Sequence, residues 1–251
     1  MKKYLLTFIP LMLSGLQLCA QKLEVSVQAN TGLFHFAGKS STATTQVLQS
    51  SASTADPMNY ANNPYGNKNG FSYGGSIQAQ LVSKGGFIVG LQGGYELLKS
   101  KVDIDKYSPL IYLTYSDYMP LTAIDPSFAV TGHVAFQNQN INLNPYIGYR
   151  FQLSKVKLDI LPGMDIGLIL DTRDKGEVKD KDGKIYKVDN KRSKAPTDVR
   201  LRLGAAASYG RYGLNASFAH GLTNYMKNYI GDASFNTHSE YLRLGLSYRL
   251  F

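Results

Sequence analysis

Long runs of alternating apolar and polar residues recur along this chain of 251 residues. Alternation with a period of two predicts strands with two chemically different faces. Most of the runs are about ten to thirteen residues long, whereas strands of soluble proteins usually have about five or six. A tilted strand that crosses a bilayer needs roughly nine to eleven residues. The run lengths therefore predict an all-β chain whose strands cross a membrane.

Eight strands are predicted from the position of the apolar set in each run. They cover residues 23–29, 71–81, 87–97, 141–151, 158–170, 199–209, 212–222 and 242–250. The opposite face carries charges of both signs, on Glu24, Glu96, Arg150, Asp159, Asp165, Arg200, Arg202, Arg243 and Arg249. An eight-stranded barrel has an interior just wide enough for side chains to fill it. We therefore expect a transmembrane antiparallel up-and-down β-barrel of eight strands, with a polar lumen plugged by side chains.

Two features of the polar face refine this expectation. Glycines recur on it, at Gly90, Gly94, Gly148, Gly163, Gly167, Gly204 and Gly245, and are expected to leave room for the long arginine side chains. Arg243 and Arg249 lie on the last strand and are expected to close the barrel by pairing with carboxylates such as Glu24 on the first strand.

The connections between the predicted strands alternate between short and long. Short turns are predicted at residues 83–86, 154–156 and 210–211, and long loops at residues 38–70, 100–140, 171–197 and 223–240. Outer-membrane barrels have short periplasmic turns and longer extracellular loops. The pattern therefore predicts an outer-membrane location in a Gram-negative cell, with both termini periplasmic.

Aromatic residues gather near the predicted strand ends. Phe87, Tyr149, Phe151, Tyr209, Tyr212, Tyr248 and Phe251 are expected to form the periplasmic girdle, and Phe71, Tyr73 and Tyr95 lie toward the outer one. Such girdles flank the apolar band of transmembrane barrels.

Residues 1–20 are typical of a cleaved secretory signal peptide, because two lysines precede an apolar run that ends at Leu18-Cys19-Ala20. A lipoprotein would retain Cys19, but it would need a small residue in place of Leu18. Cleavage after Ala20 would leave residues 21–251 as the outer-membrane barrel domain and would remove the single cysteine. No disulfide or cysteine-metal site is then expected.

Three of the long loops carry distinct signals. Residues 40–69 are rich in serine, threonine, alanine and asparagine and are expected to be mobile. Residues 109–115 and 128–130 are apolar enough to form an extra strand pair, which would give ten strands, or to fold over the barrel mouth; eight strands are preferred.

The third long loop is rich in charge, and its Asp182-Gly183 predicts a hairpin turn between strands that continue outward as a ribbon. This ribbon is either a docking surface for a protein partner or for anionic lipopolysaccharide, or simply a solvated hairpin, which is favoured. A calcium loop is disfavoured because Val178 stands where its first carboxylate is needed.

The sequence predicts no catalytic, cofactor-binding or metal-ligating residue. Some outer-membrane barrels act on lipid A with a histidine, a serine and an acid that face lipid, and His220 shares the apolar face near the outer rim. However, Leu222 rather than a serine follows it, and no nearby acid is in phase because Glu240 begins the next strand. The other histidines, His35, His133 and His238, have no ligand spacing. Export and dispersed positive charge argue against nucleic acid as a partner.

The chain also resembles the outer-membrane β-barrel family common in Bacteroidetes, often called PorT-like or porin-like. The resemblance is carried by the signal end at Ala20-Gln21-Lys22, by Gly221-Leu222-Thr223-Asn224, and by the last strand at residues 241–251, which is similar to the terminal recognition strand of outer-membrane proteins. It covers residues 21–251 and implies insertion by the barrel assembly machinery, with no particular substrate.

Together these observations predict a non-enzymatic outer-membrane barrel without a cofactor. Its plugged lumen contains charged side chains, and its extracellular loops carry any binding function. The expected partners are outer-membrane lipid, lipopolysaccharide and a protein bound by the extracellular loops. A small-solute channel with ten strands is the second hypothesis, and a lipid A-modifying enzyme is the third.

Overall fold

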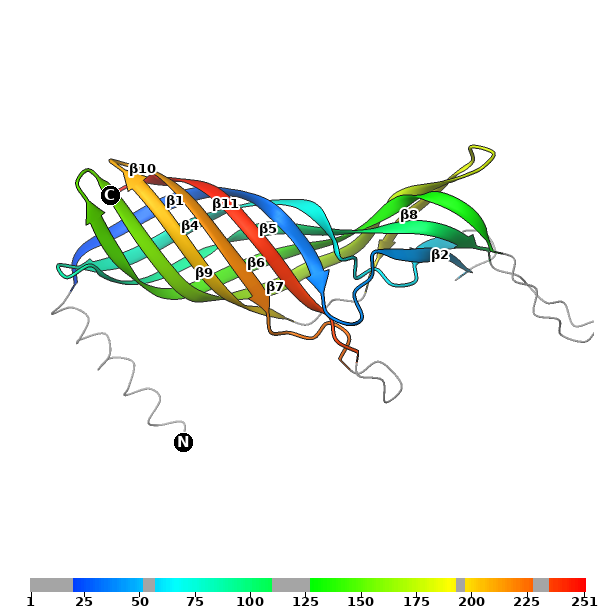
Figure 1. The fold of residues 1–251 in the computed structure, drawn as a ribbon, viewed down its shortest axis with the longest axis horizontal. Coiled ribbons are helices and arrows are strands. Elements are labelled where there is room, and N and C mark those ends of the chain that lie inside the picture. Colours follow the sequence, from blue (N-terminus) through cyan, green and yellow to red (C-terminus); the bar gives the residue numbers. More distant parts are fainter. Residues whose placement is uncertain (1–19, 52–56, 110–126, 193–196, 228–234) are drawn as a thin grey trace, which may run out of the picture.

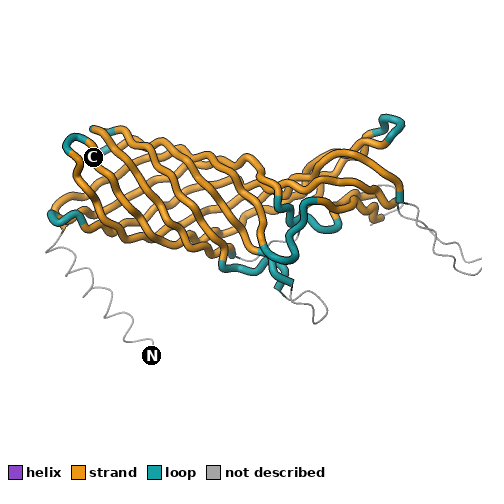
Figure 2. The backbone as a smooth tube through the Cα atoms, viewed as in Figure 1, coloured by secondary structure: helices purple, strands orange, loops and turns teal. Residues whose placement is uncertain are grey.

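The computed structural model describes residues 20–51, 57–109, 127–192, 197–227 and 235–251. Within these ranges every regular element is a β-strand (Figure 2). The strands are β1 (Ala20–Ala37), β2 (Thr44–Ser51), β3 (Pro57–Ala61), β4 (Lys68–Ser83), β5 (Phe87–Ser108), β6 (Phe128–Leu153), β7 (Val156–Asp180), β8 (Ile185–Lys191), β9 (Asp198–Tyr209), β10 (Tyr212–Gly221) and β11 (His238–Arg249). The described residues contain no helix that could span a membrane.

Eight of these strands form a closed antiparallel ring in the order β1–β4–β5–β6–β7–β9–β10–β11. Pairing of β1 with β11, from Ser26 opposite Arg249 to Ala37 opposite His238, closes the ring. Each of the eight predicted strands corresponds to one ring strand, which confirms the all-β, eight-stranded barrel. The ten-strand alternative is wrong for the described residues, because the segment around Phe128 lengthens β6 instead of adding a strand to the ring.

Three tight turns join neighbouring ring strands at one end, which is called the turn end here. They lie at Lys84–Gly86, Ser154–Lys155 and Gly210–Arg211, as predicted. In the two-residue turns only the first residue has positive φ, 58° at Ser154 and 59° at Gly210. This is the pattern of a type II′ turn, whose twist matches that of the flanking strands. The opposite end of the ring is called the loop end.

Beyond the loop end the same sheet continues into a projecting part, called the extension (Figure 1). It contains the outer parts of β5, β6 and β7, together with β2, β3 and β8. β2 pairs in parallel with β5, and β8 pairs with β7. β3 also lies against β8, since Asn59 Nδ2 donates to the carbonyl of Lys187 at 2.9 Å. The extension is therefore rolled on itself.

The extension corrects three sequence expectations. Residues 40–69, expected to be a mobile loop, contain β2 and β3 and begin β4. Much of the predicted loop 100–140 is a continuation of β5 and β6. The Asp182-Gly183 hairpin is confirmed, but its second arm is the separate strand β8 and not an outward continuation of β9. The residues before position 127 that could have formed the extra pair, 110–115, lie outside the described residues.

The apolar face changes sides between the ring and the extension. On β6, Ile141 and Leu143 point outward from the ring, whereas Val130 and Val134 are buried inside the extension. Around them the extension buries one contiguous apolar core of Val47, Ala61, Val102, Ile104, Tyr107, Val130, Val134, Val178 and Val188. Burial of apolar area drives folding in water. The extension follows this rule, with an apolar interior, whereas the ring has a polar interior and an apolar outer face.

On β7 the change of side is accompanied by a register shift. Asp165 and Gly167 face the lumen, and after an irregularity opposite Gln139 and Asn140 the next buried residues are Thr172 and Asp174. An extra residue in a strand exchanges the two faces, so that odd-numbered residues face inward before it and even-numbered residues face inward after it. The bulge therefore sets the facing of β7 in the extension.

Candidate functional site

The lumen contains an ion-pair cluster near the turn end, centred on Arg150. This guanidinium donates to both oxygens of Glu24, at 3.1 and 2.9 Å, and to both oxygens of Asp159, each at 2.7 Å. Arg249 contacts Glu24 at 3.2 Å. Glu24 lies on β1 and Arg150 on β6, with β4 and β5 between them in the ring. The bidentate contacts therefore span the lumen in a geometry that gives strong, directional bonds.

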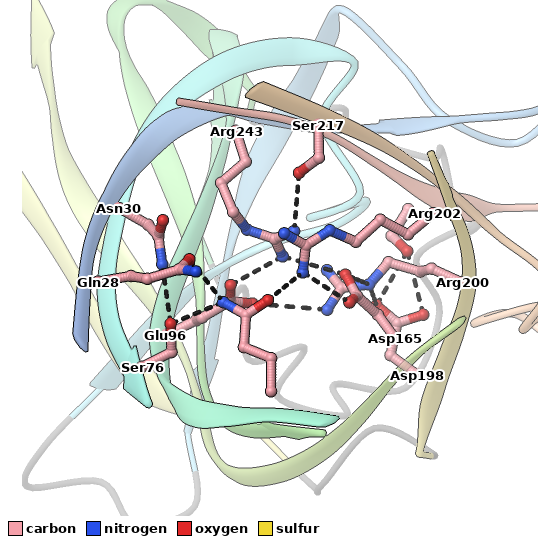
Figure 3. A network of polar contacts seen from close by, with 12 residues as sticks. Gln28, Asn30, Ser76, Glu96, Asp165, Asp198, Arg200, Arg202, Ser217 and Arg243 are labelled. Atoms are coloured by element: carbon pink, nitrogen blue, oxygen red, sulfur yellow. Dashed lines mark hydrogen bonds and ion pairs between the residues drawn. The ribbon is translucent and has the colours of Figure 1, made fainter. Parts of the chain in front are cut away.

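A second cluster lies closer to the loop end (Figure 3). Arg243 Nη2 lies 2.7 Å from Glu96 and 3.0 Å from Asp165. Arg200 lies 3.6 Å from Glu96, and Arg202 lies 3.3 Å from Asp165. Arg200, Arg243 and Asp165 have no solvent-exposed side-chain surface. Charges buried in this way must be paired to be tolerated. The ion pairs therefore hold these side chains across the lumen, where they block it.

Amide side chains fill the space between the two clusters. Gln92 donates to Gln28 at 3.1 Å and accepts from Arg202 at 2.9 Å, and Gln80 donates to Glu24 at 3.0 Å. The cavity that remains here has a volume of about 50 Å³. Such a volume holds only a few water molecules.

The lumen glycines were expected to leave room for arginine side chains, but only some of them do. A Cβ on Gly90 would lie 2.3 Å from the ring of Tyr146, so this glycine accommodates an aromatic side chain. Gly167 fits the expectation better, since its Cβ would lie 3.6 Å from a guanidinium nitrogen of Arg200.

An aromatic cluster, called the aromatic cap, covers the lumen at the loop end. It contains Phe34, Phe36, Leu98, Phe136, Ala219, Tyr225 and Tyr241, with Tyr65 and Ile169 packed against it. The ring of Phe36 contacts Phe34, Tyr65 and Tyr225 edge to face, with centroids 5.0–5.2 Å apart. The lumen is therefore closed by apolar packing above its polar layers.

Among the charged residues of the lumen, most of the sequence predictions are confirmed and one is corrected. All nine charged residues predicted for the polar face point into the ring, and Arg249 pairs with Glu24 across the β1–β11 closure as expected. Arg243 does not pair with Glu24, because it lies closer to the loop end and contacts Glu96 and Asp165 instead. The aromatic cap was not predicted, although Phe34 and Phe36 share the inward parity of Glu24 on β1.

The outward face of the ring is apolar along its whole circumference. Leu203, Leu214 and Leu246 are 60%, 64% and 64% exposed. The predicted girdle residues at the turn end also point outward. Tyr212 meets Tyr248 edge to face with ring centroids 5.4 Å apart, and Tyr149 meets Phe151 in the same way at 4.9 Å.

A group of basic side chains, called the basic band, lies on the outward face just beyond the apolar part of the ring. Its members are Lys99, Lys101, Arg173, Lys175 and Lys191. The strand register places Lys99, Gln137, Arg173 and Lys191 in one row across β5, β6, β7 and β8. Asp171 and Asp189 contact members of the band, at 2.9–3.9 Å. The band therefore carries a net positive charge.

At the tip of the extension, Asp180 organises the predicted hairpin. Its carboxylate accepts hydrogen bonds from the backbone N–H groups of Asp182 and Lys184, each at 2.9 Å, and from the hydroxyl of Tyr186 at 3.2 Å. The carboxylate is thus used by the turn.

One buried carboxyl group lies in the extension beyond the ring. Burial raises the pKa of Asp174 to about 6, against the opposing effect of Arg192, whose Nε donates to it at 2.6 Å. Its second carboxylate oxygen is buried without a hydrogen-bond partner.

Histidines that the sequence placed apart come together at the loop end of the ring. His220 and Glu240 are directly opposite on β10 and β11, and His35 is opposite Glu240 on β1. His238 lies on the same side of β11. The expectation that no acid is in phase with His220 is therefore wrong. It failed because the strand register, and not the distance along the chain, decides which residues of β10 and β11 face each other.

Neither models of known protein families nor curated proteins match the chain. Among solved structures, the chain is similar to Ail, the attachment invasion locus protein of Yersinia pestis, in complex with the heparin analogue sucrose octasulfate, with 11% identity, a TM-score of 0.33, and coverage of 92% of this chain and 100% of that chain. It is also similar to Neisserial surface protein A, with 14% identity, a TM-score of 0.36, and coverage of 91% and 99%. The beta domain of the Bordetella autotransporter Brka has 12% identity, a TM-score of 0.22, and coverage of 91% and 99%. The barrel assignment of this chain rests on its own hydrogen-bonded ring.

Proposed function

We propose that this protein is a non-catalytic integral barrel of the Gram-negative outer membrane, with a closed lumen and an outward extension that serves in binding. The change of apolar side between ring and extension carries this proposal. Soluble proteins rarely expose contiguous apolar patches larger than a few hundred Å², whereas the entire outer wall of the ring is apolar. A bilayer around the ring and water around the extension account for both polarities.

In this proposal residues 1–20 direct export and are removed, the assembly machinery inserts residues 21–251, and both termini are periplasmic. The turn end then faces the periplasm and the extension faces the cell exterior. The proposed orientation follows from the alternation of short turns and long connections.

Orientation can be tested with single cysteines, because the only native cysteine, Cys19, lies in the segment expected to be removed. Lys181→Cys lies at the tip of the extension, and Lys84→Cys lies in a turn at the opposite end. A membrane-impermeant maleimide added to intact cells is expected to label Lys181→Cys, and to label Lys84→Cys only after permeabilisation. The reverse pattern, or equal labelling of both in intact cells, would contradict the proposal.

A closed lumen argues for a non-conducting barrel and against a small-solute channel. The paired arginine clusters and the aromatic cap occupy the interior at successive levels, and eight strands leave little room around them. In planar bilayers the purified protein is expected to show no stable single-channel conductance. Stepwise openings of constant size would favour the channel instead.

We further propose that the basic band contacts the phosphate groups of lipopolysaccharide. In the proposed orientation it lies just outside the apolar wall, at the level where lipid headgroups begin. Lys99 also lies over the ring of Tyr73, 5.8 Å from its centroid, so it is held next to the outer aromatic girdle. Clustered Lys and Arg side chains attract anionic surfaces over about one Debye length.

The band can be tested by replacing Lys99, Lys101 and Lys175 with glutamine. Binding of the protein to immobilised lipopolysaccharide is expected to weaken and to lose salt dependence. A matched control removes the same charge from the tip, at Lys181, Lys184 and Lys187. An equal loss in both variants would show that overall charge, and not the position of the band, controls binding.

The proposed absence of catalysis is tested on lipid A itself. The mass spectrum of lipid A is expected to be the same in cells with and without the protein. A mass change that depends on His220 would establish the enzyme hypothesis.

A further inference from the structure

Three of the four histidines of the chain gather around one carboxylate on the outward face of the ring. This group, called the rim cluster, consists of His35 on β1, His220 on β10, and His238 and Glu240 on β11. It lies one row beyond Leu33, Leu242 and Phe218, which are the last exposed apolar residues on these three strands. The cluster is therefore at the loop-end rim, accessible from outside.

Two imidazole nitrogens point at the same carboxylate oxygen. His220 Nδ1 lies 3.2 Å and His238 Nε2 lies 3.8 Å from Glu240 Oε1. The potential ligand atoms of these three residues all lie within 4.8 Å of one another. The imidazole rings of His220 and His238 are 4.6 Å apart between centroids, so two positive charges here would repel each other at close range. A metal ion that replaces the proton between His220 and Glu240 would instead find three electron-pair donors converging on one point.

Neighbouring side chains hold two members of the rim cluster in place. His238 Nδ1 lies 3.5 Å from the side-chain oxygen of Asn236, and its Nε2 faces Glu240. His35 Nε2 lies 3.3 Å from the other oxygen of Glu240. Its Nδ1 is buried without a partner, so His35 contacts Glu240 through Nε2 alone. Hydrogen bonds of this kind around the ligands are typical of metal sites.

We propose that His220 Nδ1, His238 Nε2 and Glu240 Oε1 bind a divalent transition-metal ion of the zinc class, with His35 as a positioning residue that orients Glu240. A set of two imidazoles and one carboxylate matches Zn²⁺, Ni²⁺ or Cu²⁺ and disfavours Mg²⁺ and Ca²⁺, which prefer oxygen ligands. Tetrahedral binding draws the three donor atoms to about 3.4 Å from one another, given metal–ligand distances of about 2.1 Å. The exposed position of His220, whose side chain is 47% accessible, leaves room for that rotation and for a fourth ligand from solvent.

Such an ion would join β10 to β11, and His35 would link its ligand Glu240 to β1, the strand that closes the ring with β11. Binding to the folded barrel alone stabilises it in proportion to the logarithm of metal concentration over the dissociation constant. The site thus predicts a metal-dependent increase in barrel stability that does not depend on the nature of any partner of the extension.

The test uses the full mature chain, purified in detergent without a histidine tag. Equilibrium dialysis against Zn²⁺ is expected to give one ion per chain, and Co²⁺ is expected to show the visible absorption of a tetrahedral complex. His220→Ala, His238→Ala and Glu240→Gln are each expected to weaken Zn²⁺ binding at least about tenfold, by analogy with the effect of losing ligand-supporting groups. Excess Mg²⁺ is expected not to displace Zn²⁺.

His133→Ala is the matched control, because His133 is the remaining histidine and lies on the outward face of β6 in the extension. It is expected to bind Zn²⁺ as the wild type does. For His35, alanine is expected to reduce affinity and glutamine, which can still donate to Glu240, to restore part of it, with the stability of the metal-free protein unchanged. Heat-modifiable gel migration verifies that each variant is folded.

Zinc is also expected to raise the temperature at which the wild-type barrel loses its compact gel migration, but not that of His220→Ala. The proposal is overturned if the wild type binds no zinc, if folded His220→Ala and His238→Ala variants bind as tightly as the wild type, or if His133→Ala removes the binding.

Discussion

Arg243 on β11 extends across the lumen to Glu96 on β5, with its Nη2 atom 2.7 Å from a carboxylate oxygen. Both side chains are almost completely buried, and the same guanidinium contacts Asp165 on β7. One arginine thus links three strands that are not neighbours in the ring.

Arg243→Ala is expected to lower the free energy of unfolding by about 3–5 kcal/mol, because it leaves buried carboxylates without their partner. Conductance in planar bilayers is expected to stay absent, since the Arg150 cluster and the aromatic cap remain. Urea titration in detergent with gel migration as the readout measures the first effect. Adding Glu96→Gln to Arg243→Ala should restore part of the stability, and a conducting Arg243→Ala barrel would refute the closed-lumen model.

Phe36→Ala is expected to destabilise the barrel by about 3–5 kcal/mol, because it removes a fully buried ring from the aromatic cap and leaves a cavity. Phe71→Ala is the matched control. Phe71 is 60% exposed on the outward face of β4, so its loss should change stability in detergent by much less. Equal effects of the two substitutions would show that the cap does not contribute as a packed core.

Gly90→Ala is expected to cost about 1–3 kcal/mol, since the new methyl group would overlap the buried ring of Tyr146. Gly75→Ala should be nearly neutral, because the closest atom to its Cβ is the carbonyl oxygen of Gln28 at 3.6 Å. Both glycines lie in ring strands, so the comparison separates overlap from the general effect of losing a strand glycine. Combining Gly90→Ala with Tyr146→Ala should reduce the penalty of the glycine substitution.

The extension is expected to become less stable as the pH rises from 4 to 7. The folded-state pKa of Asp174, about 6, is higher than the value of about 3.9 for an exposed aspartate. The resulting stabilisation is complete below the unfolded-state pKa and is lost as the pH rises through the folded-state value. The difference is on the order of 3 kcal/mol.

Hydrogen-exchange protection factors for β7 and β8, which correct for the intrinsic effect of pH, measure this dependence. Asp174→Asn should remove it, because the asparagine does not titrate. Asp189→Asn is the control, since that carboxylate is 58% exposed and its substitution should leave the pH dependence intact. An unchanged profile in Asp174→Asn would show that another group is responsible.

The sequence by itself determined the eight ring strands, the three tight turns and the inward face. Alternation identifies a strand locally. The runs are long enough to cross a bilayer, and the charges of both signs on one face indicate that this face is enclosed in the barrel. The sequence alone therefore places Glu24, Arg150 and Arg249 in the lumen. The sequence does not show which arginine pairs with which carboxylate, because the pairing depends on the position of each residue along the barrel axis. Arg243 and Glu24 lie at different levels, and only the register between strands reveals this.

Tertiary structure alone decided the extension and the rim cluster. Along β5 the side chains continue to alternate between the two faces past Leu97 and Leu98. From Leu98 onward, however, the apolar residues lie on the inward face, whereas before it they lie on the outward face. A local sequence pattern does not show whether lipid or water surrounds a strand. The pairing of β2 with β5 and the contact of β3 with β8 join segments distant in sequence. His35, His220 and Glu240 meet for the same reason. The hydrogen-bond register of β1, β11 and β10 sets them side by side, and chain separation contains no information about that register.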